Sequence, residues 1–255
     1  MKVAVITGAS SGIGKNFVMQ IDKYFDVDQI YVIARRIDLL NELQQYTKAQ
    51  IMPLQLDLSN RDSFDVYEQF LKDNNPDIKL LINCAGFGKF GDFTSVPKEV
   101  NMNMVDLNCN ALQAMTYLSI PYMKEEARIV QVASMSSIQP VPYINLYAAT
   151  KAFVFSFSRA LNVELKKKKI HCIALTPFWV GTSFFDVANK NDFIKYYDII
   201  YKPEFIVEKC YKHIIKKKPK DVCVPGKYAR MQYRLVKILP HKLVMKIWLK
   251  KEHIK

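Results

Sequence analysis

The chain has 255 residues, of which 50% are hydrophobic and 24% charged, and its formal net charge is +13. This length can bury a large core as one α/β domain, and without linkers or repeats a largely disordered chain is excluded. Residues 1–150 carry 13 Lys and Arg against 16 Asp and Glu, whereas residues 151–255 carry 24 against 8. No nucleic-acid partner is predicted, because no binding motif accompanies the charge and the run at 166–169 falls at an expected helix end, where cations are favoured.

The cysteines are odd in number and scattered, without the paired spacing typical of metal sites. We expect reduced, mostly buried thiols of a cytoplasmic protein and no metal site. The first residues, MKVAVIT, are apolar only as far as a glycine-rich loop, and no run of about 18 apolar residues occurs anywhere. The sequence therefore predicts neither secretion nor a membrane-spanning helix.

An expected strand at 2–7 leads at once into the loop TGASSGIG and a helical pattern from Phe17 to Phe25. Strand, glycine-rich turn and helix are the context in which a dinucleotide pyrophosphate binds at a helix N-terminus. The glycine spacing is G-x-x-x-G-x-G, and TGASSGIG resembles the cofactor loop of the short-chain dehydrogenase/reductases. This resemblance implies a nicotinamide cofactor bound by Gly8, Ser10, Ser11, Gly12, Ile13 and Gly14.

A second expected strand, 29–34, ends at Arg35 and Arg36, where an NAD-binding member of the family would usually carry an acidic residue. Two guanidinium groups would instead bind a 2'-phosphate bidentately, and Ser11 could add a hydroxyl. We therefore predict NADP(H) rather than NAD(H).

Expected helices at 37–46 and 63–72 alternate with a third strand, which ends at Asp57, and a fourth at 79–86. By the resemblance, Asp57 and Leu58 flank the adenine. The family's NNAG motif corresponds to NCAG here, namely Asn83, Cys84, Ala85 and Gly86.

Residues 129–151 run from an apolar strand pattern through a Ser- and Pro-rich loop into a helix that carries Tyr147 and Lys151. Side chains four residues apart share a helix face, and an ammonium group beside a phenol favours the phenolate. The sequence thus predicts a tyrosine that can act as an acid or a base. The same spacing at Tyr233 and Lys237 follows no strand that ends in Ser, and we interpret it as a solvated helix face.

Asn108, Ser134, Tyr147 and Lys151 occur in the order and spacing of the family's catalytic residues. The resemblance implies that Tyr147 transfers the proton and that Ser134 orients the substrate oxygen. It also implies that Lys151 lowers the pKa of Tyr147 and binds the nicotinamide ribose, and that a helix kinked at Asn108 holds a proton-relay water.

A strand at 169–176 leads to the segment PFWVGT, in which Pro177, Val180 and Thr182 are expected to contact the nicotinamide end of the cofactor. The family commonly has Gly after this Pro. Phe178 stands there instead, which resembles the branch of 17β-hydroxysteroid dehydrogenases and long-chain ketoacyl reductases.

Residues 177–201 are rich in aromatic side chains, which is typical of a lid over an apolar substrate. They are Phe178, Trp179, Phe184, Phe185, Phe193, Tyr196, Tyr197 and Tyr201. The predicted substrate set consists of Phe87, Tyr143, Phe178, Trp179, Phe184 and Phe185, with ordinary core packing as the alternative for each.

After an expected helix at 205–217 and a last strand at 221–226, the tail from Lys227 holds nine basic residues and one acidic residue. Beyond Pro240, one helical face carries the apolar side chains Leu243, Val244, Ile247 and Trp248, with lysines elsewhere. Three contacts remain open for this tail: an anionic membrane, the substrate entrance of the same chain, or a partner subunit.

Together these patterns predict an α/β fold with a doubly wound parallel seven-stranded sheet, the Rossmann fold, over residues 1–226 and a basic amphipathic extension over 227–255. We expect NADP(H)-dependent interconversion of a carbonyl and a secondary alcohol on an apolar, steroid- or bile-acid-like substrate. A 3-ketoacyl thioester reductase is the alternative within this class. A non-catalytic NADP-binding protein and a peripheral membrane protein are the alternatives outside it. The resemblance also implies a homodimer or homotetramer, formed by helices at 101–123 and 147–168.

Overall fold

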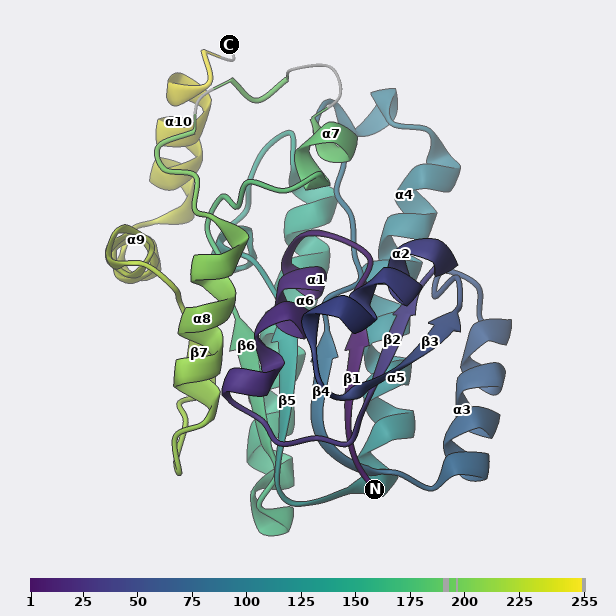
Figure 1. Cartoon of the computed structure of the whole chain (residues 1–255). Coiled ribbons are helices and arrows are strands. Elements are labelled where there is room, and N and C mark those ends of the chain that lie inside the picture. The colour runs from purple at the N-terminus through teal and green to yellow at the C-terminus, as the bar shows by residue number, and fades with distance from the viewer. Residues whose placement is uncertain (190–192, 196, 254–255) are drawn as a thin grey trace.

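One parallel sheet of seven strands forms the centre of the molecule, in the order β3-β2-β1-β4-β5-β6-β7 (Figure 1). The computed structural model describes residues 1–189, 193–195 and 197–253. The strands are β1 (Lys2–Thr7), β2 (Gln29–Ala34), β3 (Gln50–Gln55), β4 (Asp77–Asn83), β5 (Met123–Val132), β6 (His171–Leu175) and β7 (Val222–Cys223). The order reverses between β1 and β4, which confirms the predicted doubly wound Rossmann fold.

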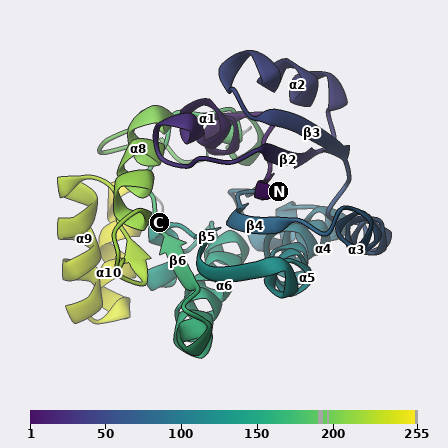
Figure 2. The same ribbon diagram turned by 60° about the horizontal axis from the view of Figure 1, so that its bottom comes forward.

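Helices cover both faces of the sheet (Figure 2). They are α1 (Gly12–Gln20), α2 (Ile37–Asn41), α3 (Asp62–Asn74), α4 (Lys98–Val105), α5 (Leu112–Ser119), α6 (Asn145–Glu164), α7 (Phe184–Ala188), α8 (Pro203–Ile214), α9 (Lys227–Ile238) and α10 (His241–Lys251). Figure 2 shows α1, α2 and α8 on one face and α3, α5 and α6 on the other, with α9 and α10 beside the edge where the chain ends.

Alternation along the strands divides the core into two layers, because successive strand side chains point to opposite faces. In β1, Ala4 and Ile6 pack with Phe17 of α1 in one cluster. Val3 and Val5 pack in the other cluster, on the side of α3 and α5. All these side chains are fully buried, so the short apolar runs in the sequence are strands covered on both faces.

Several predicted boundaries move, and three of these shifts have a clear local cause. The third strand ends at Gln55 rather than Asp57, because Asp57 accepts hydrogen bonds from the backbone N–H and the hydroxyl of Ser59 and turns the chain there. The first helix begins at Gly12, not Phe17, since the end of the glycine loop forms its first turn. The last strand has only two residues, as it lies at the sheet edge and pairs with β6 alone.

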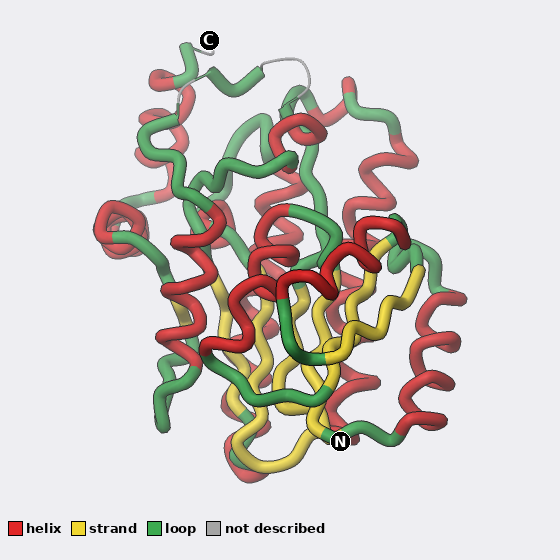
Figure 3. The backbone as a smooth tube through the Cα atoms, viewed as in Figure 1, coloured by secondary structure: helices red, strands yellow, loops and turns green. Residues whose placement is uncertain are grey.

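The five cysteines are free thiols and four of them are buried, as expected. Across the described residues, no helix combines the length and the apolar composition needed to cross a membrane. The loops after the strands gather at one end of the sheet, below α7 and α10 (Figure 3). Ligands of open α/β sheets bind at this carboxyl end.

Candidate active site

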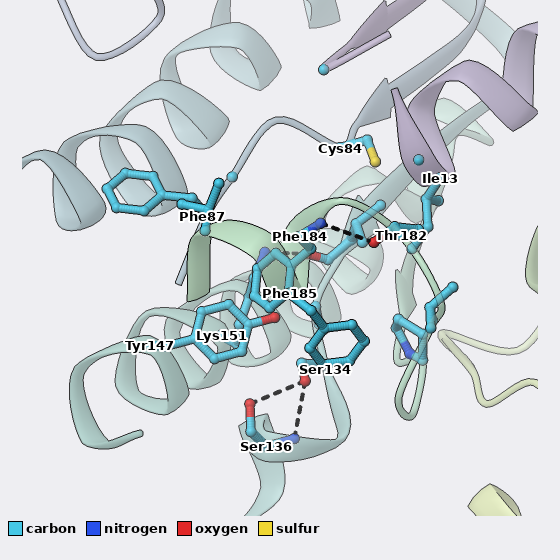
Figure 4. Close-up of a pocket in the computed structure, with 18 of the residues that line it drawn as sticks. Ile13, Cys84, Phe87, Ser134, Ser136, Tyr147, Lys151, Thr182, Phe184 and Phe185 are labelled. Carbon is cyan, nitrogen blue, oxygen red and sulfur yellow. Dashed lines mark hydrogen bonds between the residues drawn. The ribbon is translucent and has the colours of Figure 1, made fainter. Parts of the chain in front are cut away.

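A cavity of about 920 Å³ lies at the carboxyl ends of the strands. Its walls come from the loops that follow β1 to β6 and from α9 and α10. A close-up of this cavity shows Tyr147, Lys151 and Ser134 near Phe184 and Phe185 (Figure 4). Segments far apart in the sequence therefore form one continuous surface.

The glycine loop after β1 has the shape needed to hold a pyrophosphate. Gly8 and Gly12 have positive φ angles of 66° and 54°, which favour glycine. A Cβ on Gly8 would lie 2.8 Å from the backbone N of Ala85, and one on Gly12 would lie 3.2 Å from the Thr182 side chain. The N-terminus of α1 follows directly, where the first backbone N–H groups have no partner within the helix, so the loop fits the phosphates of a dinucleotide.

Two arginines line the end of the cavity after β2. The guanidinium of Arg36 donates to the Ser10 hydroxyl at 3.0 Å, which connects it to the glycine loop. Arg35 lies 3.8 Å from the Asp57 carboxylate, in an exposed ion pair. Burial opposes ionisation of Asp57, but hydrogen bonds from Ser59 and the charge of Arg35 prevail and lower its pKa. This end of the cavity is thus cationic and rich in donors.

The NCAG segment after β4 runs along the cavity close to β1. The Thr7 hydroxyl accepts hydrogen bonds from the backbone N–H groups of Cys84 and Ala85, at 3.0 and 3.1 Å. Burial raises the pKa of the Cys84 thiol to about 12, so this residue is a neutral part of the wall. Asn83 points into the core instead, where its amide donates to Gln131 at 3.0 Å.

Asn108 lies in a π-helical stretch, Asp106–Ala111, between α4 and α5. The predicted helix irregularity at this residue is therefore present; the relay water stays a prediction. The Asn108 side chain is fully buried and hydrogen-bonds to the backbone of Phe87 and to the Thr150 hydroxyl. A Cβ on Gly86 would approach the Asn108 amide oxygen to 2.8 Å, so the loop and this amide fit closely.

Ser134, Tyr147 and Lys151 line the cavity together. The Ser134 oxygen accepts hydrogen bonds from the backbone N–H and the hydroxyl of Ser136, at 3.2 and 3.0 Å (Figure 4). The Lys151 ammonium donates to the Val132 carbonyl at 2.8 Å and lies 5.8 Å from the centre of the Tyr147 ring. The strand end and the first turns of α6 thus bring the three groups to one place.

Burial dominates the ionisation of this site. It raises the pKa of Tyr147 to about 12, although the Ser134 hydroxyl acts in the opposite direction. It lowers the pKa of Lys151 to about 8. In this structure the pKa of Tyr147 thus lies above its usual range, because removal from water penalises the phenolate. The lowering expected from Lys151 together with a bound cofactor stays a prediction.

The segment after β6 connects the cofactor loop to the lid. Gly181 N–H donates to the carbonyl of Tyr201 at 2.9 Å, and Tyr201 N–H donates to the carbonyl of Trp179 at 2.8 Å. These bonds hold the backbone around Val180 in an extended form. Phe178, in the place of the family's usual Gly, packs edge-on against Tyr228 of α9 at 5.6 Å. The substitution therefore adds a contact with the tail.

Aromatic rings pack around Tyr147. The ring centre of Phe184 lies 5.4 Å from that of Tyr147. The ring centre of Phe90 lies 6.4 Å from that of Tyr147, in an edge-to-face arrangement. Gly88 makes room for this packing, since a Cβ there would lie 2.9 Å from Phe184 and 3.0 Å from the Tyr147 ring. Phe184 of the predicted lid thus packs beside the Tyr147 ring; Tyr196 lies outside the described residues.

The tail helix α10 forms part of the cavity wall, which was one of the three contacts left open. Trp248 donates from its indole N–H to the carbonyl of Pro142 at 3.1 Å. Lys251 forms an ion pair with Asp198 at 2.8 Å. The predicted apolar face is divided: Val244 and Trp248 pack inward, whereas 44% of Leu243 and 53% of Ile247 are exposed.

Most of the predicted site residues line the cavity, including Phe87, Phe178, Trp179, Phe184 and Phe185. Four do not: Gly14, Asn83, Asn108 and Tyr143. A Cβ on Gly14 would lie 2.2 Å from the carbonyl oxygen of Gly8, so that glycine permits close packing within the loop. Tyr143 packs on Phe193 at 5.0 Å, outside the cavity, because its backbone turns through a φ of 65°.

Sequence reasoning missed several wall residues from the tail and the serine loop. They include Ser136, Gln232, Val236 and Lys251, each of which lines the cavity. The amphipathic pattern after Pro240 was a signal for an inward face, but nothing local identified the surface that it covers.

Residues 2–192 match the family described as short chain dehydrogenase. The chain is 31% identical over 208 residues to 17-beta-hydroxysteroid dehydrogenase type 3 of Rattus norvegicus, which covers 78% of this chain and 66% of that protein. It is 32% identical over 192 residues to very-long-chain 3-oxoacyl-CoA reductase-B of Danio rerio, which covers 71% and 60%. The chain thus matches less than two thirds of the length of these curated relatives.

Two solved structures have the same architecture. A short-chain dehydrogenase from Sphingobium yanoikuyae in complex with NADPH superposes with a TM-score of 0.78 at 23% identity, over 92% of each chain. The 3-ketoacyl-(acyl-carrier-protein) reductase from Brucella melitensis complexed with NADH has a TM-score of 0.74 at 26% identity, over 88% of this chain and 95% of that one. The likeness to the first shows the fold alone.

Proposed function

Because the chain belongs to the short chain dehydrogenase family, we propose that it is an oxidoreductase that interconverts a carbonyl group and a secondary alcohol with NADP(H). One observation carries this proposal. The cavity that holds Ser134, Tyr147 and Lys151 is also lined by the glycine loop. A single site therefore combines a dinucleotide cradle with a group that can transfer a proton.

Each residue has a distinct role in this mechanism. When bound, the nicotinamide ring supplies or accepts the hydride. Tyr147 donates its phenolic proton to the substrate oxygen in reduction and takes it back in oxidation. Ser134, oriented by Ser136, holds that oxygen. Lys151 stabilises the phenolate that remains after proton donation.

The ionisation of the site favours reduction. Burial keeps the Tyr147 pKa at about 12, so the phenol carries its proton at neutral pH and can donate it. Loss of that proton in the reaction places a negative charge beside Lys151, whose pKa of about 8 leaves much of it charged near pH 7. Proton donation to a carbonyl oxygen thus begins from the protonation states that the fold favours.

The choice of NADP(H) rests on the two arginines after β2. Arg36 is oriented by its hydrogen bond to Ser10, beside the loop that would hold the pyrophosphate. Guanidinium groups bind phosphate bidentately, and the 2'-phosphate is the group that distinguishes NADP from NAD. Of the two similar solved structures described above, one contains NADPH and the other NADH.

An extended apolar ketone is the proposed substrate. Phe90, Trp179, Phe184, Phe185 and Trp248 line the cavity around Tyr147. Such walls favour a molecule with a large apolar body and one polar atom at the reacting end. The relatives named for hydroxysteroids and for very-long-chain 3-oxoacyl-CoA make a steroid-like ketone the first candidate and a ketoacyl thioester the second.

We also propose that residues 1–226 form the catalytic unit and that the extension 227–255 completes its cavity through α9 and α10. Exposed apolar side chains on α5 and α6, such as Tyr117 (76% exposed) and Val163 (70% exposed), support a homodimer or homotetramer through these helices. Helices α9 and α10 lie away from α5, on the side of α8 (Figure 2).

Oxidation of NADPH and NADH, followed by the absorbance of the reduced nicotinamide, tests the proposal against steroid, bile-acid, ketoacyl-thioester and small ketones. We expect turnover with NADPH and an extended ketone. Tyr147→Phe should lower kcat by about a hundredfold to ten-thousandfold, the usual contribution of a positioned acid. Tyr233→Phe is the matched control, because Lys237 also follows it by four residues and lies 4.5 Å from its ring.

Turnover of small polar ketones alone would contradict the proposal that the substrate is an extended apolar ketone. Tight binding of NADPH without turnover of any ketone, unchanged in Tyr147→Phe, would favour a non-catalytic NADP-binding protein.

A further inference from the structure

The outer surface of α9 and α10 combines exposed apolar side chains with many cations; we call this surface the tail face. Its apolar members are Met231, Leu235, Ile238, Leu243 and Ile247, which are 43–79% exposed. Its cations are Lys227, Arg230, Arg234, Lys237, Lys242, Lys246 and Lys250. Within the described residues, none of these seven forms an ion pair.

On α9 the apolar row and the cations adjoin. Met231, Leu235 and Ile238 are four and three residues apart, so they form one stripe along the helix. Arg230 and Arg234 line the same shallow groove as this stripe. The opposite side of the helix is packed on the protein, where Ala229 and Val236 are buried. The stripe therefore faces solvent and is not part of the hydrophobic core.

We propose that the tail face docks on the surface of an anionic lipid bilayer. The Lys and Arg side chains of an amphipathic helix bind acidic lipid headgroups, and its exposed Leu, Ile and Met side chains insert at the boundary between headgroups and acyl chains. No acidic residue occurs from 227 to 251, so nothing on the helices repels such a surface.

Other partners fit this surface less well. A second copy of the chain would bring two sets of seven cations together, and like charges oppose that contact. A nucleic acid would pair with the cations but would leave Leu235 and Ile238 without an apolar partner. A bilayer surface satisfies both components at once.

The tail face is continuous with the catalytic cavity. Ile247 is 53% exposed on the tail face and also lines the cavity, where it lies with Val244 and Trp248 of the same helix. Docking would thus place the apolar phase of a membrane next to the route into the site. The docking itself does not depend on the proposed activity and can be measured by binding alone.

Docking is tested directly by the fraction of the full chain that sediments with lipid vesicles. Vesicles of phosphatidylcholine alone are compared with vesicles of phosphatidylcholine plus phosphatidylserine. We expect binding to the anionic vesicles that weakens as salt is added. Arg234→Gln with Lys237→Gln should weaken it by roughly 25-fold, from about fivefold for each cation near the surface. Lys166→Gln with Lys167→Gln, an equal loss of exposed charge before β6, is the matched control.

The apolar stripe is tested by Ile238→Ser, which alters a side chain 79% exposed, against Val66→Ser on α3, a side chain 54% exposed. Only the former should weaken vesicle binding. Because all these side chains are exposed, thermal unfolding and NADPH turnover should not change, which separates failure of docking from failure of the catalytic proposal.

Equal binding to neutral and anionic vesicles would overturn the proposal, as would tail-face variants that bind like the unaltered chain. A DNA duplex that binds more tightly than the anionic vesicles, with no effect of Ile238→Ser on either, would instead assign the tail face to nucleic acid.

Discussion

The side chain of Asn108 pairs with both backbone groups of Phe87: the Phe87 N–H donates to Oδ1 at 3.0 Å, and Nδ2 donates to the Phe87 carbonyl at 2.9 Å. The same Nδ2 donates to the Thr150 hydroxyl at 3.0 Å, and that hydroxyl donates to the Tyr147 carbonyl at 2.7 Å. One amide therefore connects the loop after β4 to α6, the helix that carries Tyr147.

Asn108→Ala should remove this connection and destabilise the fold. It leaves buried donors and acceptors of Phe87 and Thr150 unpaired, which costs about 2–4 kcal/mol of unfolding free energy. For a chain of this size the melting temperature should fall by roughly 5–15 °C. Asn110→Ala is the control, since among the residues that the structure describes its side-chain amide bonds only to Asp106, one turn earlier. Equal melting temperatures for the two variants would contradict the connecting role.

Lys151 should make stability depend on pH. Burial lowers its pKa from 10.5 to about 8, so between these values the unfolded chain holds a proton that the folded chain has released. The free energy of unfolding therefore rises with pH across this window, and the stabilisation is lost as pH falls through 8.

Urea unfolding of the unaltered chain and of Lys151→Met from pH 8 to 10.5 measures this effect. Between these two pH values, the free energy of unfolding of the unaltered chain should rise by about 2–4 kcal/mol relative to that of Lys151→Met. The raised pKa of Tyr147 acts in the opposite direction above pH 10, but it is present in both proteins and largely cancels. If the difference in unfolding free energy between the two proteins did not depend on pH, burial would not lower the pKa of Lys151.

Arg36→Ser should discriminate between the two cofactors. If Arg36 binds the 2'-phosphate, its removal should raise the KM for NADPH about tenfold to a hundredfold, the value of a charged hydrogen bond, and leave the KM for NADH unchanged. Steady-state kinetics with both cofactors measure this, with Arg234→Ser on the tail as a control. Equal losses for NADPH and NADH would mean that Arg36 acts through Ser10 and the glycine loop.

Trp248→Ala should weaken the binding of extended substrates more than that of small ones. Its ring lines the cavity, and loss of roughly 60 Å² of apolar contact at about 25 cal/mol per Å² corresponds to a tenfold higher KM. Trp248→Phe keeps a ring and loses only the hydrogen bond to Pro142, so its effect should be smaller. If Trp248→Ala raised the KM equally for small and extended ketones, Trp248 would not contact the extended part of the substrate.

Much of the site was predictable because its residues follow strand ends. Ser134 ends an apolar run and Tyr147 and Lys151 share a helix face, and both features are local in the sequence. The resemblance of the glycine loop and of NCAG supplied the remaining cofactor positions. Asn83 and Tyr143, by contrast, occur at suitable places in the chain but point away from the cavity, since side-chain direction depends on the backbone turn and on neighbours in space.

The sequence by itself determined the alternation of strands and helices, the cofactor loop and the order of the catalytic residues. These features depend on period, turn chemistry and spacing, which are properties of short segments. Only the tertiary structure decided that α10 closes the cavity through Trp248 and Pro142, residues 106 positions apart, and that burial raises the pKa of Tyr147. Both depend on which surfaces meet and exclude water when the chain folds, and no local pattern contains that information.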